Sequence, residues 1–348
     1  MMTAGQGSTF EDPTELITTS PIEVTHQTTG SSMTSSSSRG AGFYLQYAVV
    51  VIGVVGTTAN GLVLYAMVAS KQHKKHVLIF NQNLLDFVSC LFLVATYTFR
   101  LCSVYLEGTL GYWLCILLWG EGCSWAPYFG SLINLAAVTI ERYLKVVHRA
   151  WAKQKLSKSI IHSAAAFAWI GGIVTVVGVT IPTTDVVGGV CYTMVFFNSQ
   201  AGRMAYGIWQ FLSFYIIILL ICIFCYGRIL MAVRRQAIVM AAHSAGGSSA
   251  GQAQISKMQA GVIKTMMLVS ILFTISWAPA SVLSLIWYTS SNLKLNMIEL
   301  YTAAFMGYLY ICTNPFIYAT KFDPVKRVLL NLISCKRATQ VSESIELT

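Results

Sequence analysis

Long apolar runs alternate with short polar stretches along most of the chain. A bilayer core about 30 Å thick is crossed by roughly 20 helical residues, because an α-helix rises about 1.5 Å per residue. Seven runs reach that length, at approximately 43–70, 77–101, 114–147, 159–181, 205–235, 259–288 and 298–320. The pattern therefore predicts an all-α membrane protein, a seven-transmembrane helix bundle. The third, fifth and sixth runs exceed a perpendicular span, so we expect these helices to tilt or to extend into the cytoplasm.

The composition supports this prediction. Of the 348 residues, 55% are hydrophobic and 10% are charged, against about 25% charged in a soluble domain. The net charge of +10 comes from basic residues placed between the apolar runs rather than in one basic domain, which argues against nucleic acid as a partner. Most Lys and Arg residues fall in alternate loops and the tail. Because cytoplasmic flanks accumulate them, we expect a multi-pass plasma-membrane protein with an extracellular N-terminus.

Polar segments flank the seven runs. Residues 1–42 are rich in Ser and Thr and contain no apolar stretch, so they predict a disordered extracellular N-terminal arm before a transmembrane domain at 43–320. At 321–335, the stretch "FDPVKRVLLNL" spaces apolar residues as an amphipathic membrane-surface helix does, and 336–348 follow as a cytoplasmic tail. Cys335 ends this helix and is a candidate palmitoylation site. The alternative is a soluble tail packed on the loops, with Cys335 a free thiol.

Several polar residues fall at membrane depth. Asp86 lies in the middle of the second run, and Asn60, Ser131, Asn134 and Asn314 lie at similar depth in the first, third and seventh. A charge inside the bilayer costs about 2.5–3.5 kcal/mol, so each such residue is a candidate for function. Together they predict one water-filled or cation-holding cluster, with sodium at Asp86 as the candidate ion and no other metal or cofactor. The alternative is that they only join helices by hydrogen bonds.

Two short motifs predict moving parts. Glu141 precedes Arg142 near the cytoplasmic end of the third run, where a buried guanidinium needs a carboxylate partner. A simple interfacial arginine is the alternative. Asn314 precedes Pro315 in the middle of the seventh run. The proline weakens the helix at one point and the amide can pair with Asp86, so we expect two helix arrangements of similar energy.

These motifs resemble those of the rhodopsin-like, class A, G-protein-coupled receptors over nearly all of residues 43–335. The matching positions, one group per helix, are Asn60; Asp86; the acid-Arg-Tyr motif Glu141, Arg142 and Tyr143; Trp169; Tyr226; the switch residues Phe273, Trp277 and Pro279; and the Asn-Pro-x-x-Tyr motif that begins with Asn314 and Pro315 and ends with Tyr318. Single motifs of this kind are weak evidence. Their order along the chain makes coincidence remote.

The resemblance implies a receptor that binds an extracellular ligand and promotes nucleotide exchange on a heterotrimeric G protein, with arrestin and a receptor kinase as further partners. Activation would move the sixth span outward, swing Tyr226 and Tyr318 inward, and expose Arg142 to the G protein. The resemblance also implies a disulfide between Cys115 and Cys191. We expect no enzyme, because no catalytic triad, metal cluster or phosphate loop converges in the sequence. An ion channel or transporter using Asp86, and a non-signalling decoy receptor, stay open as alternatives.

Three positions depart from the family pattern. Cys115 lies two residues further from Arg142 than is usual, and we expect an irregularity at Pro127 to absorb them. Ile218 replaces the usual proline of the fifth span, which leaves the helix bulge there open. The sixth span lacks the acid that usually pairs with the arginine. We therefore expect Glu141 to be the main restraint on Arg142 and basal activity to be raised.

The ligand is the least defined prediction. Ser124 replaces the aspartate of amine receptors, although Glu121 lies one turn outward, and the seventh span has no lysine for retinal. The expected pocket is aromatic, with Arg100, Glu121 and Glu299 as charged anchors, and fits a peptide or a small polar molecule. Its residues are Tyr97, Glu121, Ser124, Trp125, Tyr128, Trp277, Tyr301 and Tyr308. Trp209 and Trp287 individually fit the interfacial aromatic belt better.

Overall fold

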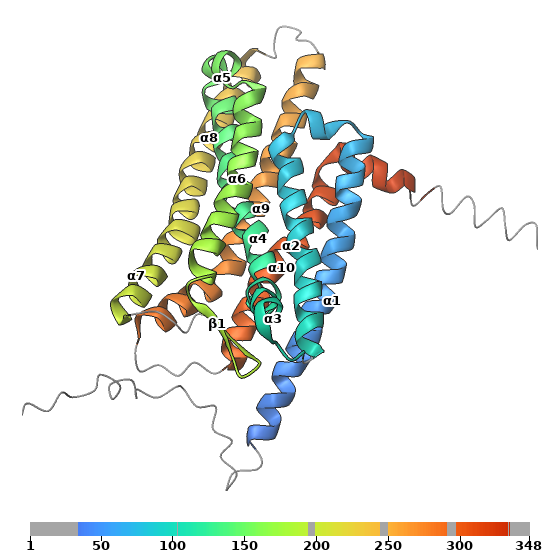
Figure 1. Cartoon of the computed structure of the whole chain (residues 1–348). Helices are drawn as coiled ribbons and strands as arrows, with labels where there is room; N and C mark the ends of the chain where they lie inside the picture. Colours follow the sequence, from blue (N-terminus) through green and yellow to red (C-terminus); the bar gives the residue numbers. More distant parts are fainter. Residues whose placement is uncertain are drawn as a thin grey trace, which may run out of the picture.

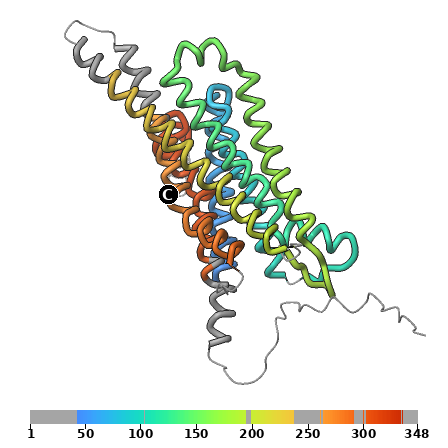
Figure 2. Tube along the Cα trace, turned by 90° about the vertical axis from the view of Figure 1, so that its left-hand side faces the viewer, coloured from blue at the N-terminus to red at the C-terminus, as the bar shows by residue number. Residues whose placement is uncertain are grey.

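Long helices run side by side in an elongated bundle, as both views in Figures 1 and 2 show. The computed structural model describes residues 34–102, 104–193, 199–243, 250–290, 297–332 and 334. The long helices are α1 (Thr34–Ala69), α2 (Val77–Leu101), α4 (Gly122–Val147), α6 (Lys158–Thr180), α7 (Gln200–Phe211) with α8 (Ile217–His243), α9 (Ala250–Thr289) and α10 (Met297–Lys321). The predicted all-α bundle is confirmed, and each predicted run corresponds to one of these helices or to the α7–α8 pair.

Shorter elements connect these helices. They are η1 (Gln72–Lys74), α3 (Gly108–Leu114), η2 (Cys115–Trp119), α5 (Arg149–Lys155), η3 (Leu212–Ile216) and the strands β1 (Thr184–Val187) and β2 (Val190–Thr193). Both η2 and η3 are π-helical turns. Within the described residues, the backbone is also helical at 323–332, after a break at Phe322.

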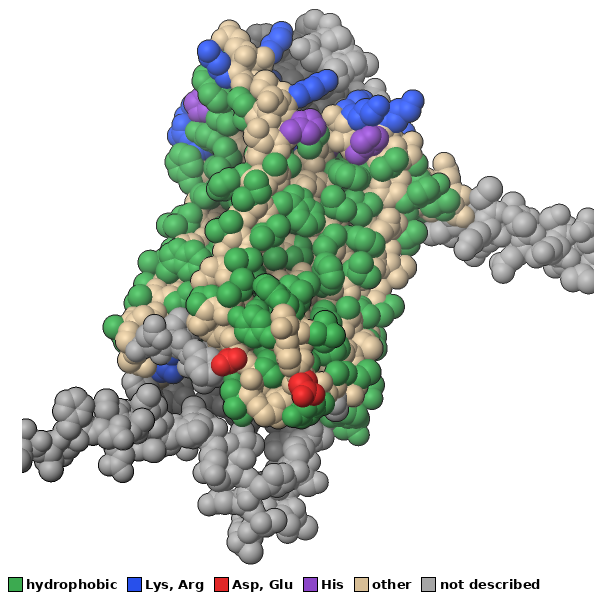
Figure 3. Space-filling model, in the orientation of Figure 1, with side chains coloured by type: hydrophobic (Ala, Val, Ile, Leu, Met, Phe, Trp, Pro, Cys, Tyr) green, Lys and Arg blue, Asp and Glu red, His purple; other side chains and the backbone are tan. Residues whose placement is uncertain are grey.

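The outer surface of the bundle is apolar. Five stretches of helix in the described chain are long and apolar enough to cross a membrane: Phe43–Ala69, Val77–Leu101, Lys158–Thr180, Gln200–Gln236 and Ile263–Thr289. Large apolar side chains such as Phe167 and Ile223 are more than 60% exposed. Figure 3 shows apolar side chains over the middle of one face, with Lys, Arg and His gathered at the upper end. This distribution is that of a protein whose sides face lipid.

Helix α4 lies against α2, α6 and α8 and forms the centre of the bundle. Small residues let α4 and α6 approach closely. A Cβ added to Gly172 would overlap the carbonyl oxygen of Ala126, and one added to Gly130 would lie 2.9 Å from the carbonyl oxygen of Ala168. Close backbone approach of this kind is how membrane helices gain packing energy without a hydrophobic driving force.

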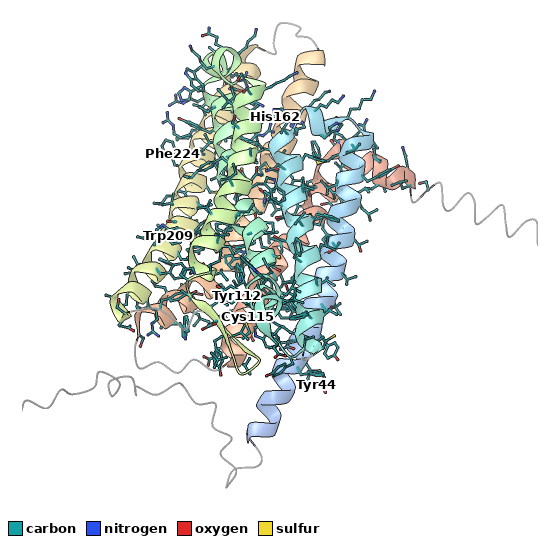
Figure 4. The ribbon with its side chains drawn as sticks, in the orientation of Figure 1. Tyr44, Tyr112, Cys115, His162, Trp209 and Phe224 are labelled. Atoms are coloured by element: carbon teal, nitrogen blue, oxygen red, sulfur yellow. A yellow bond between two sulfur atoms is a disulfide. The ribbon has the colours of Figure 1, made fainter. Side chains whose placement is uncertain are left out.

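A disulfide ties the outer end of the bundle to the hairpin of β1 and β2. The strands are antiparallel, and Cys191 of β2 is bonded to Cys115, with their Cα atoms 5.5 Å apart. Gly188 and Gly189 form the two-residue turn with φ of 59° and 79°, the conformation that such hairpins favour. Figure 4 labels Cys115 beside the hairpin. The expected Cys115–Cys191 pairing is therefore confirmed.

The two extra residues before Arg142 are accommodated at η2, so the expectation of an irregularity at Pro127 is wrong. Pro127 lies inside the continuous helix α4. The chain instead makes a π turn at η2 and then a break in which Glu121 has a φ of 60°. Gly122 permits this break, because a Cβ there would lie 2.6 Å from the carbonyl oxygen of Ile116.

The fifth span keeps a helix irregularity without the usual proline. The π turn η3 ends two residues before Ile218, which is itself buried. A π turn inserts one extra residue into a helix and re-aims the side chains around it. Proline is therefore not required here.

Both chain ends extend beyond the described part. Helix α1 begins at Thr34, nine residues before the expected first span, and the rest of the predicted N-terminal arm lies outside the described residues. After α10, Val325 is buried, whereas Leu330 and Leu332 are exposed, so the segment at 323–332 has two different faces. Cys335 and the tail lie outside the described residues.

Candidate functional site

A buried cluster of polar side chains surrounds Asp86 between α2, α4 and α10. The Ser131 hydroxyl donates to Asp86 Oδ1 at 2.6 Å, and Asn314 Nδ2 donates to Asp86 Oδ2 at 2.8 Å. All three residues are fully buried. A carboxylate at this depth needs such donors, because an unpaired charge away from water is very costly. The structure thus brings Asp86, Ser131 and Asn314 together.

Asn60 does not contact Asp86 directly. Its Nδ2 donates to the carbonyl oxygen of Ile311 at 3.1 Å and to that of Gly56 at 3.0 Å, so it joins α1 to α10 beside the cluster. The carbonyl of Ile311 is available because Pro315, four residues further on, has no N–H to bond it. The weakened point of α10 is therefore where Asn60 binds.

Gln82 is a member of the cluster that the sequence did not single out. Its Nε2 contacts the Ser131 hydroxyl and lies 3.5 Å from Asp86 Oδ1, and Asn134 Nδ2 donates to Gln82 Oε1 at 2.8 Å. Its position four residues before Asp86 places it on the same helix face. The four-residue spacing from Asp86 could have indicated Gln82 from the sequence.

The switch residues of α8, α9 and α10 lie beside this cluster. Phe273, fully buried on α9, packs edge-on to Tyr310 of α10 with ring centroids 5.8 Å apart. The Tyr226 hydroxyl lies 3.3 Å from Thr139 Oγ1 and 3.5 Å from Ser270 Oγ. The Tyr318 hydroxyl is buried without a hydrogen-bond partner among the described residues. Pro279 and Pro315 lie inside α9 and α10.

Arg142 has two polar neighbours at the inner end of α4. Its Nη2 lies 3.4 Å from Glu141 Oε2 and 3.1 Å from His76 Nδ1. An arginine can only donate, so His76 Nδ1 accepts and its proton must be on Nε2. Glu141 is shared, because its other oxygen pairs with Lys145. The expectation that Glu141 is the main restraint on Arg142 therefore omitted His76, which directly precedes α2.

The environment of His76 keeps it neutral. Burial, together with the Arg142 cation, lowers the pKa of His76 from 6.5 to about 4. Its ring also packs edge-on to Phe322 with centroids 5.5 Å apart, at the break after α10. His76 thus joins α2, α4 and the chain after α10. Tyr143 points elsewhere, with its hydroxyl 3.0 Å from His148 Nε2.

A cavity of about 300 Å³ lies in the outer half of the bundle, between α2, α4, α7, α9 and α10. Six of the predicted pocket residues line it, namely Tyr97, Glu121, Trp125, Tyr128, Trp277 and Tyr308. The floor is aromatic, since the rings of Tyr128 and Trp277 stack with centroids 4.3 Å apart. A cavity of this size suits a small molecule.

Two of the predicted ligand-binding residues, Ser124 and Glu299, are placed differently, and a third cannot be compared. Ser124 does not line this cavity; it is buried with its hydroxyl 3.5 Å from Thr96 Oγ1. The side chain of Tyr301 lies outside the described part of the structure, and Glu299 is exposed in the first turn of α10. The sequence prediction missed the wall formed by Gln210, Phe211 and Phe214. The aromatic run "WQFLSFY" in the fifth span could have indicated it.

The two charged residues of the cavity bind each other. Arg100 Nη1 lies 2.9 Å from Glu121 Oε1, and the Tyr97 hydroxyl donates to the same oxygen at 3.1 Å. The Tyr308 hydroxyl donates to the other carboxylate oxygen. The positive φ of Glu121 after η2 turns its carboxylate toward these partners. This group, Arg100, Glu121, Tyr97 and Tyr308, is called the outer ion-pair network below.

Such a bundle, with a polar cluster at its centre and a cavity between that cluster and the end that carries the disulfide, is the architecture of a seven-helix membrane receptor. Residues 59–318 match the family described as 7 transmembrane receptor (rhodopsin family). This match covers well over half of the chain. The protein therefore belongs to the rhodopsin family of seven-transmembrane receptors, as the motifs indicated, and is a multi-pass membrane protein that signals as a receptor and is not an enzyme.

The chain is also similar to individual receptors with different names. It is 24% identical to melanin-concentrating hormone receptor 1 of Sus scrofa over 307 residues, which is 84% of this chain and 80% of the relative. It is 22% identical to C-C chemokine receptor type 8 of Mus musculus over 316 residues, with 84% and 80% covered. It is 22% identical to melanopsin-B of Gadus morhua over 309 residues, 85% of this chain but about half of the relative's length (48%).

Proposed function

We propose that the protein is a plasma-membrane receptor that binds a small extracellular molecule in the outer cavity and promotes nucleotide exchange on a heterotrimeric G protein. One observation carries the proposal: Arg142 is nearly buried at the inner end of α4 and is held there by Glu141 and His76. A guanidinium held by two polar neighbours among the described residues can be released by a modest movement. Its release supplies a cationic surface for a partner.

The proposed mechanism needs only rearrangement of contacts. Trp277 forms the cavity floor, and Gly307 of α10 fits against its ring, since a Cβ there would lie 2.7 Å away. A ligand that displaces Trp277 would therefore shift α10, and with it Asn314 and its bond to Asp86. Movement of the part of α10 between the Asp86 cluster and Phe322 would then separate Arg142 from His76. The cytoplasmic face catalyses exchange on the G protein by binding its nucleotide-free state preferentially.

Among ligand classes, the cavity favours the small-molecule alternative over a peptide. Two relatives are named for melanin-concentrating hormone and for C-C chemokines, and the third is named melanopsin-B. The seventh span of this chain has no lysine before Lys321 at its end, so covalent attachment of retinal within this span is disfavoured. At Asp86, the carboxylate, the Ser131 hydroxyl and the unpartnered Asn314 Oδ1 are oxygen donors that fit a sodium ion.

The remaining expectations are part of the same proposal. The N-terminus is extracellular and the basic loops are cytoplasmic, where arrestin and a receptor kinase would bind in addition to the G protein. The segment at 323–332 would lie on the bilayer surface, with Cys335 palmitoylated. A decoy without signalling is disfavoured because η3 retains the irregularity of the fifth span. A channel is disfavoured because the family matched over residues 59–318 is a receptor family.

The test is ligand-free exchange by receptor reconstituted in lipid nanodiscs with each of the main Gα classes. Wild-type receptor should accelerate exchange on at least one class above empty nanodiscs, and Arg142→Ala should abolish this. Arg149→Ala is the matched control, because Arg149 is an exposed arginine at the same end that bonds Gln236. Equal exchange by the two variants would contradict the proposed role of Arg142. Ion conductance in receptor vesicles without exchange would favour a channel.

A further inference from the structure

The negative charge in the outer cavity is already neutralised. The Glu121 side chain is 9% exposed, and its two oxygens accept from Arg100, Tyr97 and Tyr308. An ammonium group that entered the cavity would have to displace one of these donors. Withdrawing one partner from a buried ion pair leaves the other charge uncompensated, and a single new charge contact does not recover that cost. Glu121 is therefore a poor anchor for a cationic amine.

The positive charge is engaged in the same way. Besides Glu121, the Arg100 guanidinium binds the carbonyl oxygen of Trp119, with Nε at 3.1 Å, and it lies over the Tyr97 ring at 5.0 Å. An anionic ligand would have to compete with a carboxylate 2.9 Å away and with these two further contacts. The two charges of the outer ion-pair network are thus paired with each other. Among the described residues, the cavity offers a ligand no unpaired charge of either sign.

Three other polar groups in the cavity wall lack partners among the described residues. They are the Tyr128 hydroxyl, Trp277 Nε1–H and Gln210 Oε1. Tyr128 and Trp277 are 4% and 6% exposed, so neither group is solvated by bulk water. An indole N–H can only donate and an amide oxygen can only accept. These three atoms have almost no surface open to the cavity, so the selectivity of the cavity depends on its charged pair and its aromatic rings.

We propose that the cavity selects an uncharged aromatic molecule, and that the Arg100–Glu121 pair excludes charged analogues. The stacked rings of Tyr128 and Trp277 provide the flat apolar surface that an aromatic ligand needs. The inference rests on the proposed function for its biological meaning. The charge selectivity, however, is a property of the cavity and is measured on the receptor alone.

Three indole compounds of similar size test the selectivity: tryptophol, which is uncharged; tryptamine, an ammonium; and indole-3-acetate, a carboxylate. Their binding to purified receptor in nanodiscs is measured by saturation-transfer NMR titration. Tryptophol should bind at least about tenfold more tightly than either charged compound, a free-energy difference of about 1.4 kcal/mol. Ala304→Trp, which fills the cavity wall, should abolish binding. Tighter binding of a charged compound, or no saturable binding of tryptophol, overturns the inference.

Opening the ion pair should reverse the preference. Arg100→Gln leaves the Glu121 carboxylate without its cation, so tryptamine should become the tightest of the three. Glu121→Gln frees Arg100 and should favour indole-3-acetate. Arg203→Gln is the matched control, because Arg203 is another arginine at this end, bonded to the Ser290 carbonyl and outside the cavity lining. It should keep the wild-type order. If both cavity variants fold and keep that order, the pair does not set selectivity.

The outcomes separate this inference from the proposed function. The binding order uses no G protein, whereas the exchange assay uses no ligand. A receptor that exchanges nucleotide but prefers tryptamine refutes only the inference about the ligand. A receptor with the expected binding order but no Arg142-dependent exchange refutes only the signalling proposal.

Discussion

Replacing His76 with leucine should raise ligand-free activity. The substitution keeps an apolar side chain against Phe322 but removes the acceptor that lies 3.1 Å from Arg142 Nη2. A hydrogen bond to a charged group contributes about 1.5–3 kcal/mol. Because His76 is only half-buried, the lower figure applies. A loss of about 1.5 kcal/mol from the restrained state alone shifts the equilibrium toward released Arg142 by roughly tenfold.

Glu141, the remaining partner of Arg142, cannot fully compensate for the lost hydrogen bond to His76. Glu141 lies 3.4 Å from Arg142 and shares its carboxylate with Lys145. Basal exchange on a responsive Gα should therefore rise by up to about tenfold in His76→Leu. His73→Leu is the matched control, since His73 is in the same loop but its ring nitrogen lies 3.4 Å from the Met67 carbonyl oxygen instead. At equal receptor density, similar basal exchange in the two variants would refute the reasoning.

Three further predictions follow from single contacts. The pKa of His76 in the folded protein, about 4, lies below its ordinary value of 6.5, so the unfolded chain binds the extra proton. Thermal stability in detergent should fall as pH drops from 6.5 to 4, more steeply in wild type than in His76→Leu; parallel profiles would refute this. Gly172→Ala should destabilise the bundle by about 1–3 kcal/mol through overpacking, measured as a lower melting temperature. Gly178→Ala in the same helix, where a Cβ meets nothing within 4 Å, should not. Gly307→Ala should displace Trp277, whose ring atoms lie 2.7 Å from the added Cβ, and change both its fluorescence and basal exchange; an unchanged spectrum would contradict the proposed contact.

The bundle could be predicted because bilayer physics constrains it strongly. The run at 77–101 coincides with α2, and its interior carries Asp86, whose cost in lipid requires partners on other helices. Ser131 and Asn314 were predicted from their similar depth in other spans, and both are those partners. Gln82 was missed because an amide costs less to bury than a charge, so its presence in a span gives a weaker signal.

The rest depended on contacts between distant segments. Nothing near His76 in the sequence indicates Arg142, because the two meet only when the start of α2 packs against the end of α4. The same holds for the outer ion-pair network: Arg100 and Glu121 were both expected as anchors for a ligand. Their pairing depends on η2 and on the positive φ of Glu121, and local sequence does not specify this turn. The irregularity was expected at Pro127 because proline is the commonest cause of a kink.

Unpaired polar groups explain why two arrangements of α10 can have similar energies. The Asn314 Oδ1 and the Tyr318 hydroxyl are buried without partners among the described residues. Each costs about 1–3 kcal/mol in this arrangement. A movement of α10 that paired one of them would recover about as much as release of Arg142 from His76 loses. The restrained state is then held by a small margin, and a ligand that binds the other arrangement only a few kcal/mol better suffices to shift the population.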